Sequence, residues 1–263
     1  KGIEVLLSDN SNVQDSRLGE MLELTHTTFL IENPRELWVS SRMPSINPAF
    51  AIAEVFAILA GSNDAKFINF WNPVLPKYAG YSSEYYGAYG FRLKKQFDID
   101  QIESAYDSLR NNPNSRQIVL QIWDPKSDLP NQDGSPRADD IPCNICSFLK
   151  VRNGKLEWMQ IMRSNDLYRG TPYNFVQFTT LQEIIAGWLN LEVGTYCQIS
   201  DSLHLYTKDL LEIDQSRLLS SKPSQNNSYD LRLPKNDWSC VFKEALNCMQ
   251  LMADQDLSIS QFN

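Results

Sequence analysis

Residues 142–189 decide the fold and read PCNICSFLKVRNGKLEWMQIMRSNDLYRGTPYNFVQFTTLQEIIAGWL. Two β-rich runs, Cys146 to Arg152 and Lys155 to Arg163, are separated by Asn153-Gly154, a strong signal for a tight hairpin turn. A helix is expected from about Phe178 to Leu189. Consecutive strands joined by a tight turn predict an antiparallel sheet, so this stretch places the chain in the α+β class.

Outward from this stretch, one more strand and one more helix are expected. Arg116 to Trp123 is rich in residues that favour strands. Asn47-Pro48 supplies a helix N-cap followed by proline at the first helical position, and Gly61 closes that segment. Strands therefore alternate with helices along the chain.

Two polar stretches interrupt these elements. Asp124 to Pro142 is rich in Pro, Asp, Ser and Gly and predicts a long surface loop, and Ser220 to Asp230 is similar. Because neither is composed like a flexible interdomain linker, we expect residues 1–263 to form a single domain.

The composition narrows the class of protein. Hydrophobic residues make up 42% of the 263 residues and charged residues 21%, as in ordinary globular proteins. No apolar run approaches the roughly 18 residues that span a bilayer, and residues 1–7 are too short and too acidic for a secretory signal. We therefore expect a cytoplasmic protein with no membrane contact. A net charge of −8 disfavours nucleic-acid binding but allows one small phosphorylated ligand held by a few arginines.

Cysteine and histidine usage limits the kinds of site. Five cysteines, an odd number in a large chain, argue against a disulfide framework. With two histidines, His26 and His204, a histidine-rich metal site is excluded, so we expect no metal.

Glu54 is the first candidate for chemistry. Its helix reads PAFAIAEVFAILAG and is apolar on every side except for this carboxylate, which predicts that the helix is buried. Desolvation would raise the pKa of Glu54 and make it a candidate general acid or base near neutral pH. The alternative is a carboxylate that caps a structural polar group.

Cys143 is the second candidate. It follows Pro142 where the long loop enters a strand, a position that can expose a side chain at the end of a sheet. The spacing to Cys146 suggests a redox or zinc pair, but residues three apart on an extended strand point to opposite faces, so the two should not meet. We expect Cys146, Cys197, Cys240 and Cys248 to be structural, whereas arginines at strand ends could activate Cys143 as a thiolate.

Arginines offer a phosphate site. Arg163, in the run MRSND, lies at the end of the second hairpin strand beside a hydroxyl and an amide, a combination that suits phosphate. Arg116 lies at another strand start. For either arginine taken alone, a surface salt bridge is the alternative.

His204 and Tyr206, in the run DSLHLY, share one side of an extended segment and could clamp a sugar hydroxyl. A single histidine in an apolar setting is more often structural. The residues by themselves therefore indicate a cytosolic enzyme with a buried carboxylate, a candidate thiolate and arginines suited to phosphate.

In their order along the chain, these motifs resemble the thymidylate synthase family. The similarity covers roughly Arg17 to Tyr206. It runs from prolyl-cysteine through the hairpin, RS-x-D and G-x-P-Y-N to H-x-Y, a long ordered signature that chance does not produce. The resemblance implies an α+β sandwich, its mixed or antiparallel sheet covered by helices, that forms a homodimer through the sheet.

The resemblance also implies roles for the reacting groups. Cys143 matches the nucleophile that adds to C6 of the pyrimidine and makes C5 a carbon nucleophile. Glu54 matches the buried glutamate that organises water and handles protons, and Tyr89 matches the proton-transfer tyrosine. Asn174 matches the asparagine that reads the uracil edge.

Phosphate ligands are implied in the same way. Arg163 and Ser164 match two of them, and Arg17 fits a mobile N-terminal arginine. Arg116 matches an arginine that the other subunit donates.

The remaining ligands are implied for the sugar and for the cosubstrate, 5,10-methylenetetrahydrofolate. His204 and Tyr206 match ribose ligands. Asp166 matches a contact to the pterin, Trp71 matches an aromatic residue on the folate side, and Gly170, which opens the G-x-P-Y-N motif, belongs to the same side.

Several positions depart from the family pattern. Asn144 replaces the usual histidine after the nucleophile, and Gln117 replaces a second arginine. Met162 replaces a glutamine, Val74 replaces the second tryptophan of the folate wall, and Ser202-Leu203 replace Asp-Thr. The closing tail of the family is not recognisable in LSISQFN at the end of the sequence.

Some of these variants resemble the phage deoxycytidylate hydroxymethylase branch, in which water instead of hydride finishes the reaction. That branch typically has aspartate where this chain has Asn174, and an asparagine amide can serve uracil. We therefore expect dUMP as the nucleotide and thymidylate synthesis as the activity, with 5-hydroxymethylation of dUMP or dCMP as the alternative. A fold retained only as a binding module is a remoter alternative.

Overall fold

The computed structural model describes residues 2–7, 11–16, 18–39, 42, 44–213 and 230–255. Arg17, most of the polar stretch 220–230 and the tail 257–263 lie outside these residues. The helices are α1 (Gly2–Leu6), α2 (Pro48–Ala60), α3 (Ala65–Trp71), α4 (Pro76–Ala79), α5 (Tyr89–Lys94), α6 (Gln101–Asn111), α7 (Pro125–Asp128), α8 (Thr171–Trp188), the 3-10 helix η1 (Thr207–Glu212) and α10 (Lys235–Gln255). The strands are β1 (Asn12–Ser16), β2 (Gly19–Ile31), β3 (Val119–Gln121), β4 (Asn144–Arg152), β5 (Lys155–Asp166) and β6 (Glu192–Tyr206).

The strands form one mixed sheet in the order β1-β2-β6-β5-β4-β3. The predicted hairpin is confirmed, because β4 and β5 are antiparallel and Arg152 pairs with Lys155. Asn153 and Gly154 have φ of 52° and 73°, the positive values that a two-residue hairpin turn of type I′ requires. β5 and β6 are parallel and are joined through α8, so the sheet is mixed and the α+β class is confirmed.

The structure revises two predicted boundaries and one predicted loop. The strand expected at 116–123 is reduced to Val119–Gln121, because the next two backbone N–H groups both donate to Ile145 O and end the regular ladder. α8 begins at Thr171 and not at Phe178, since Pro172 occupies its first turn. The surface loop expected at 124–142 contains the short helix α7.

The helix predicted after Asn47 is confirmed. Asn47 caps α2 by accepting from Phe50 N, and Gly61 ends the helix with φ of 66°, a conformation that glycine adopts without strain. α2 packs against α8, α3 and α5. Its position therefore brings Glu54 to the inner side of the helical layer.

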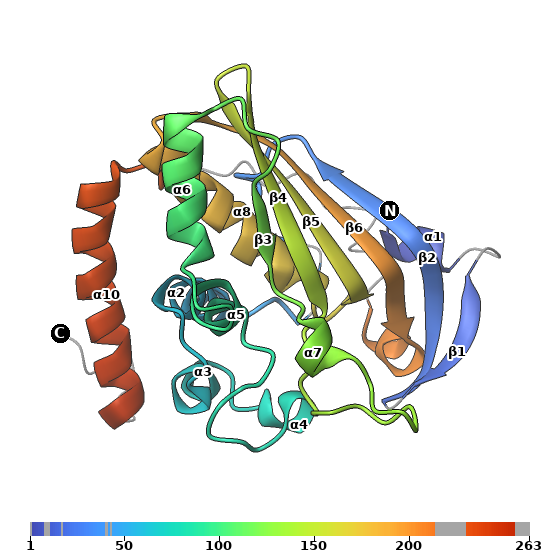
Figure 1. Ribbon diagram of the computed structural model, residues 1–263. Helices are drawn as coiled ribbons and strands as arrows, with labels where there is room; N and C mark the ends of the chain where they lie inside the picture. Colours follow the sequence, from blue (N-terminus) through green and yellow to red (C-terminus); the bar gives the residue numbers. More distant parts are fainter. Residues whose placement is uncertain are drawn as a thin grey trace.

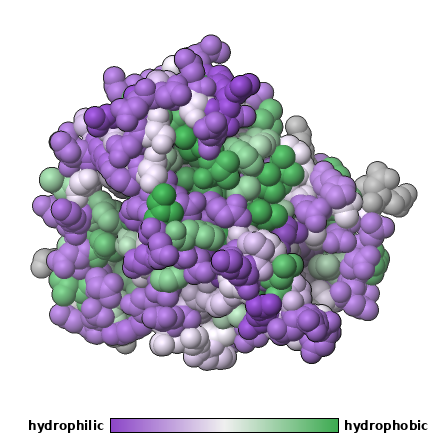
Figure 2. All heavy atoms as spheres, in the orientation of Figure 1, coloured by the Kyte–Doolittle hydropathy of each residue, from purple (hydrophilic) through white to green (hydrophobic). Residues whose placement is uncertain are grey.

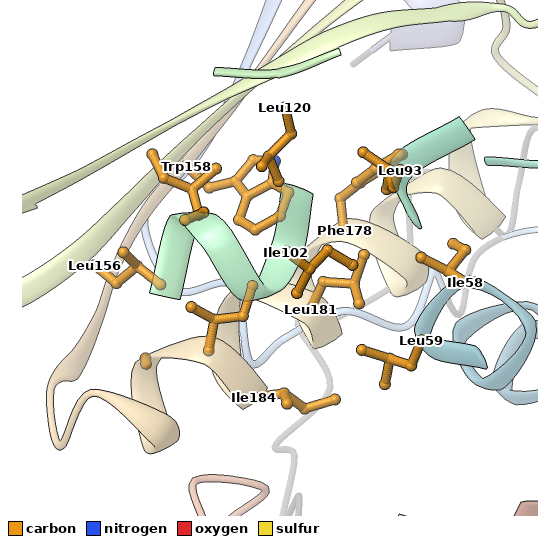
Figure 3. Packing of buried hydrophobic residues seen from close by; sticks show 14 of the residues in the cluster. Ile58, Leu59, Leu93, Ile102, Leu120, Leu156, Trp158, Phe178, Leu181 and Ile184 are labelled. Carbon is orange, nitrogen blue, oxygen red and sulfur yellow. The ribbon is translucent and has the colours of Figure 1, made fainter. Parts of the chain in front are cut away.

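The helices α2, α3, α5, α6, α8 and α10 gather on one side of the sheet (Figure 1). Between them and the sheet lies the largest hydrophobic core, in which Trp158 of β5 packs with Phe178 and Leu181 of α8, Ile102 of α6 and Leu93 of α5 (Figure 3). None of the helices in the described ranges is long and apolar enough to cross a membrane.

The sheet's other face is apolar as well. Phe148, Met159, Ile161, Cys197 and Ile199, called the open face below, are each half-buried, whereas their neighbours along β5 and β6 are buried. Figure 2 shows hydrophobic residues gathered over these strands. An apolar sheet face of this kind is typical of a protein–protein contact.

Candidate active site

Cys143 lies in the loop immediately before β4, where Arg163 holds the backbone. Arg163 N donates to Cys143 O at 2.9 Å, and the Arg163 Nε and Nη2 atoms donate to Pro142 O and Ile141 O, each at 2.9 Å. Cys143 is half-buried and is not in a disulfide. Two of the three guanidinium nitrogens of Arg163 therefore fix the backbone of the loop that carries the thiol.

Cys146 differs from Cys143 in its surroundings. The β4–β5 register shifts between Asn144 and Cys146, so the strict alternation behind the expected opposite faces does not hold there. Cys146 is 7% exposed, and burial raises the pKa of its thiol. A raised pKa disfavours the thiolate, which agrees with a structural role for Cys146.

A second group of residues surrounds Cys143, and with it forms what we call the nucleophile cluster: Cys143, Glu54, Tyr89 and Asn144. Burial raises the pKa of Tyr89 well above its usual value, and the nearby Cys143 and Glu54 raise it further. The side chain of Asn144 acts in the opposite direction on the same phenol. Three elements thus converge here, because Glu54 comes from α2, Tyr89 begins α5 and Asn144 begins β4.

Glu54 has no cation as a partner among the described residues. Its side chain is half-buried, and its Oε2 atom is fully buried without a hydrogen bond. Burial raises the pKa of Glu54 to about 8, and a hydrogen bond with Gln177 lowers it in part. A carboxyl group with this pKa can both give and take a proton near neutral pH.

His204, Tyr206 and Asp166 form a neighbouring cluster at the ends of β5 and β6. Asp166 pairs with His204 in the parallel ladder, and the rings of His204 and Tyr206 meet edge to face at 5.3 Å. Burial lowers the pKa of His204 and raises the pKa of Asp166. The His204 Nδ1 atom is buried without a hydrogen-bond partner among the described residues, which leaves it available to a ligand.

Asn174 lies in the first turn of α8 and is 7% exposed. Its Nδ2 atom lies 3.8 Å from the Met162 sulfur, a weak acceptor. Gly170 N-caps the helix, and a Cβ there would meet only ordinary contacts at 3.4 Å and beyond. The protein itself therefore does not require glycine at position 170.

Ser164 and Trp71 belong to β5 and α3. Ser164 pairs with Ser202 on β6, two residues from Asp166, and is half-buried. Trp71 is 9% exposed and packs with Phe50 of α2, so most of its surface serves the core. Its indole Nε1 is buried without a hydrogen-bond partner among the described residues.

Arg116 is exposed and lies far from Cys143 in its own chain. Val119 pairs with Phe148, so the ladder would continue with position 116 beside Val151. That point is about eight residues along β4 from Cys143, or about 27 Å. The structure therefore does not bring Arg116 to the nucleophile within one subunit, and Arg17 lies outside the described residues.

The sequence prediction missed several residues near this site. Gln177 follows Asn174 by about one helical turn of α8, and Gln160 lies at a core-facing position of β5, so helical and strand periodicity could have found both. Asp140 gave no local signal. It lies in the loop before Cys143, and its Oδ2 atom accepts from Gly87 N at 2.9 Å.

Behind the site, a buried ion pair holds the same loop. The Nη1 and Nη2 atoms of Arg92, on α5, donate to the two carboxylate oxygens of Asp128, on α7, at 3.0 and 2.9 Å. Both side chains are at most 1% exposed. Arg92 also donates to Tyr86 O through two nitrogens, so the guanidinium is well satisfied.

The described residues contain no group of three or more His, Cys, Asp or Glu side chains that could hold a metal ion. They do offer polar atoms without partners around one half-buried cysteine, at Glu54, Asn144 and His204. Buried polar groups are normally hydrogen-bonded, so such a concentration indicates a binding site for a polar ligand.

Comparison with known proteins identifies the class. The family model described as thymidylate synthase matches residues 42–253. The chain therefore belongs to the thymidylate synthase family, as the ordered motifs predicted.

Individual relatives refine the comparison. A protein named deoxyuridylate hydroxymethyltransferase from Bacillus phage SP01 is 38% identical over 198 residues, which cover 71% of this chain and 51% of that protein. A protein of the same name from Pseudomonas phage M6 is 31% identical over 215 residues, which cover 80% of this chain and 59% of that protein. The chain thus spans little more than half the length of these relatives.

A solved structure supports the fold. The crystal structure of thymidylate synthase from T4 phage matches 93% of this chain and 90% of its own, with a TM-score of 0.70 and 20% identity. At that identity the match supports only the fold, and it agrees with the α+β sandwich expected from the sequence.

Proposed function

We propose that the chain transfers a one-carbon unit from 5,10-methylenetetrahydrofolate to C5 of dUMP, and that water ends the reaction to give 5-hydroxymethyl-dUMP. The observation that carries this proposal is the nucleophile cluster, in which Cys143 and Glu54 both act on Tyr89 and Glu54 has no cation as a partner among the described residues. The names of the two phage relatives favour hydroxymethylation over the methylation that we expected from the sequence.

Cys143 begins and ends the proposed reaction. The Cys143 thiolate adds to C6, and the electron pair of the C5–C6 bond becomes available at C5. C5 forms a bond to the one-carbon unit that the folate supplies. C5 then loses its proton, the bond between the transferred carbon and the folate nitrogen breaks, and the departure of tetrahydrofolate leaves an exocyclic methylene on C5. Water adds to that methylene, and expulsion of the Cys143 sulfur restores the C5–C6 double bond.

Proton transfers in this scheme fall to Glu54 and Tyr89. Glu54 has a pKa of about 8, so it can hold a proton at the pyrimidine carbonyl and exchange it with water. Tyr89 lies near both Cys143 and Glu54, and its high pKa keeps it protonated at neutral pH. We assign to Tyr89 the transfer of the C5 proton through ordered water.

Recognition of the nucleotide is assigned to residues around the cluster. Arg163 keeps Nη1 without a hydrogen bond among the described residues and, with Ser164, would bind the phosphate. His204 and Tyr206 would bind the ribose, and Asn174 would read the base. Arg17 is proposed as a further phosphate ligand.

The folate is assigned to the side of the site formed by Asp166, Gly170 and Trp71. Asp166 Oδ1 accepts from the backbone N–H groups of Tyr168 and Arg169. These bonds fix the carboxylate at the start of α8, where its other oxygen can accept from a heterocycle N–H. The buried indole Nε1 of Trp71 is a donor in need of an acceptor, which also fits a polar cosubstrate.

We further propose that the chain is a homodimer that pairs through the open face. That face is apolar, and Leu30 and Val119 on the same sheet are 63% and 43% exposed, so pairing would remove hydrophobic surface from water. Arg116 is too far from Cys143 to act on the nucleophile of its own chain. This distance is expected of a residue that completes the site of the partner subunit.

The dimer is tested by mixing two inactive variants, Arg116→Ala and Cys143→Ser. Hybrid dimers contain one site with both residues intact, so activity should return toward about one quarter of the parent level. Native mass spectrometry would verify subunit exchange. Exchange without recovery of activity would show that Arg116 does not complete the partner's site.

Thymidylate synthesis is the second candidate. Asn144 is 0% exposed and Gln177 is 3% exposed, so bulk water is kept from part of the cluster, which would protect the methylene intermediate for reduction by hydride. In that case dihydrofolate would leave and the product would be dTMP.

One experiment separates the candidates. The protein is incubated with methylenetetrahydrofolate and either dUMP or dCMP, the nucleotide product is identified by mass, and dihydrofolate absorbance is followed. We expect 5-hydroxymethyl-dUMP without dihydrofolate, whereas dTMP with equimolar dihydrofolate would establish the synthase. Cys143→Ser serves as the control, and no product from the parent with either nucleotide would reject both candidates.

A further inference from the structure

The side chain of Met162 ends beside the amide of Asn174, the residue that the proposed function assigns to the base. Met162 is 1% exposed, and its backbone is held from both sides, by Asn144 of β4 and Ser200 of β6. Its sulfur lies 3.8 Å from Asn174 Nδ2, within hydrogen-bond range for sulfur. The proposed function gives Met162 no task.

The Asn174 amide has a protein partner at its nitrogen end only. Among the described residues, none besides Met162 bonds to its Nδ2 atom, and none donates to its Oδ1 atom. On the side of position 170 there is no side chain, and a Cβ there would lie 3.7 Å from the same Nδ2 atom. The Met162 sulfur is therefore the side-chain contact that marks the nitrogen end of the amide.

A thioether sulfur distinguishes the two ends of an amide, because it accepts hydrogen bonds and cannot donate them. With Asn174 Nδ2 beside it, an N–H donates to the sulfur. With the amide rotated end for end, Oδ1 would face the sulfur and two acceptors would meet without a hydrogen between them. The contact with Met162 therefore favours one of the two amide orientations.

The orientation matters because uracil and cytosine present opposite edges to such an amide. Uracil offers the acceptor O4 beside the donor N3–H, whereas cytosine offers an amino donor beside the bare acceptor N3. An amide in one fixed orientation presents its donor and its acceptor in one order, so it pairs with one base and mispairs with the other. An amide that can rotate serves both bases.

We infer that Met162 is a positioning residue for base specificity, whose sulfur holds the Asn174 amide in one orientation and prevents it from serving both bases. The inference rests on the proposed function for the role of Asn174 and for uracil as the preferred base. It does not rest on that function for the orientation of the amide, which follows from the contact with sulfur.

Met162→Leu tests the inference, because it removes the acceptor at nearly constant volume. We expect the ratio of kcat/KM for dUMP over dCMP to fall about fivefold, as on losing one weak hydrogen bond that selects an orientation. A change that only loosened the core would alter both rates together and leave this ratio in place.

Met252→Leu is the matched control. Met252 of α10 is 8% exposed and packs among apolar side chains. The same substitution there should keep the ratio within about twofold of the parent. An unchanged ratio in Met162→Leu, or equal falls in the two variants, would overturn the inference.

A double variant tests whether Met162 acts through Asn174. In an Asn174→Ala background, Met162→Leu should leave the ratio unchanged, because no amide remains to be oriented. A further fall of about fivefold in that background would show that Met162 acts on the base by another route, and would reject the inference.

Binding measurements separate this inference from the proposed function. Calorimetric Kd values for dUMP and dCMP give the preference of a protein that makes no product. A parent that binds dCMP more tightly would refute uracil as the base, while Met162→Leu should still move the ratio of Kd values toward one. A ratio that stays in place would reject the positioning role whichever base the parent prefers.

The orientation of the amide can also be measured without a nucleotide. In protein labelled with ¹⁵N and with ¹³C at the methionine methyl groups, the Asn174 Nδ2 protons should show a nuclear Overhauser contact to the Met162 methyl group. Asn174→Ala and the Met162 variants assign the two resonances. A parent that binds neither nucleotide would reject the proposed function, and this contact would still decide the orientation of the amide, since its absence would overturn the inference.

Met162→Ile covers the case in which Met162→Leu does not fold. Isoleucine suits a strand and also lacks an acceptor, so the same fall in the ratio is expected. A folded Met162→Ile protein with the parental ratio would contradict the positioning role.

Discussion

The regions around Glu54 and Asp128 each bury a carboxylate, but they treat it in opposite ways. Asp128 is bound through both oxygens by Arg92, whose side chain is 1% exposed. Glu54 has no cation among the described residues, and burial raises its pKa to about 8. A buried charge with a full set of partners serves structure, whereas a buried carboxyl group without a cation keeps a proton that chemistry can use.

The two regions are linked through α5, which carries both Arg92 and Tyr89. Arg92 lies on the same short helix as Tyr89, so the ion pair to Asp128 joins that helix to the loop that leads to Cys143. The paired region is thus expected to hold the site in place, and the region around Glu54 to carry out its reaction. The predictions below test this division.

The largest effect is expected for Cys143→Ser. A serine hydroxyl is far less ionised than a thiol, so turnover should fall by at least about a thousandfold while the fold and nucleotide affinity remain. Turnover and calorimetric binding of dUMP measure the two quantities. The matched control is Cys146→Ser, which should keep activity within about twofold. Activity of Cys143→Ser within tenfold of the parent would refute the covalent mechanism.

A pair of amide substitutions separates the two carboxylates. Glu54→Gln should lower kcat about a hundredfold, because it removes a proton-transfer group. It should cause no loss of stability, because Glu54 forms no ion pair with the described residues. Asp128→Asn should leave a buried guanidinium without its counter-charge and cost about 3–5 kcal/mol of unfolding free energy. Below its unfolding temperature this variant should keep most of its kcat.

Urea unfolding and initial rates on both variants provide the measurements. The division between the regions fails if Asp128→Asn loses activity without losing stability. It also fails if Glu54→Gln loses stability in place of activity.

Asn174→Asp extends the comparison by adding a carboxyl group at a position that is 7% exposed. Such a group can accept from the cytosine amino group and, when protonated, donate to cytosine N3. We expect the parent to favour dUMP by at least about tenfold in kcat/KM, and the variant to move that ratio toward dCMP by about tenfold. Competition between the two nucleotides, scored by tritium release from C5, measures the ratio. A parent enzyme that favours dCMP over dUMP would refute the assignment of uracil as the base.

The smallest effect concerns stability against pH. Burial raises the pKa of Glu54 from 4.5 to about 8, so between these values the folded protein holds a proton that the unfolded chain has released. The unfolding free energy should therefore fall as pH rises through this window. Glu54→Gln should show a flatter dependence than the parent in urea titrations at pH 5, 6.5 and 8. Identical slopes would mean that Glu54 is not desolvated.

Local sequence patterns determined a definite part of this protein. The hairpin at Asn153-Gly154, the caps of α2 and the isolation of Glu54 on an apolar helix depend on residues close together in the chain. The order of motifs around Cys143 predicted the family that the comparison confirmed. Boundaries were less certain, because β3 and α8 end or begin where contacts with other elements permit.

Only the tertiary structure decided which polar groups meet. The parallel pairing of β5 with β6 brings Asp166 beside His204, although they are 38 positions apart in the sequence. The Arg92–Asp128 pair and the amide of Asn144, oriented through Gln160 and Trp158, likewise join distant elements. Burial and hydrogen-bond direction depend on all neighbours at once, so local periodicity could nominate Glu54 and Cys143 but could not specify the groups that orient them.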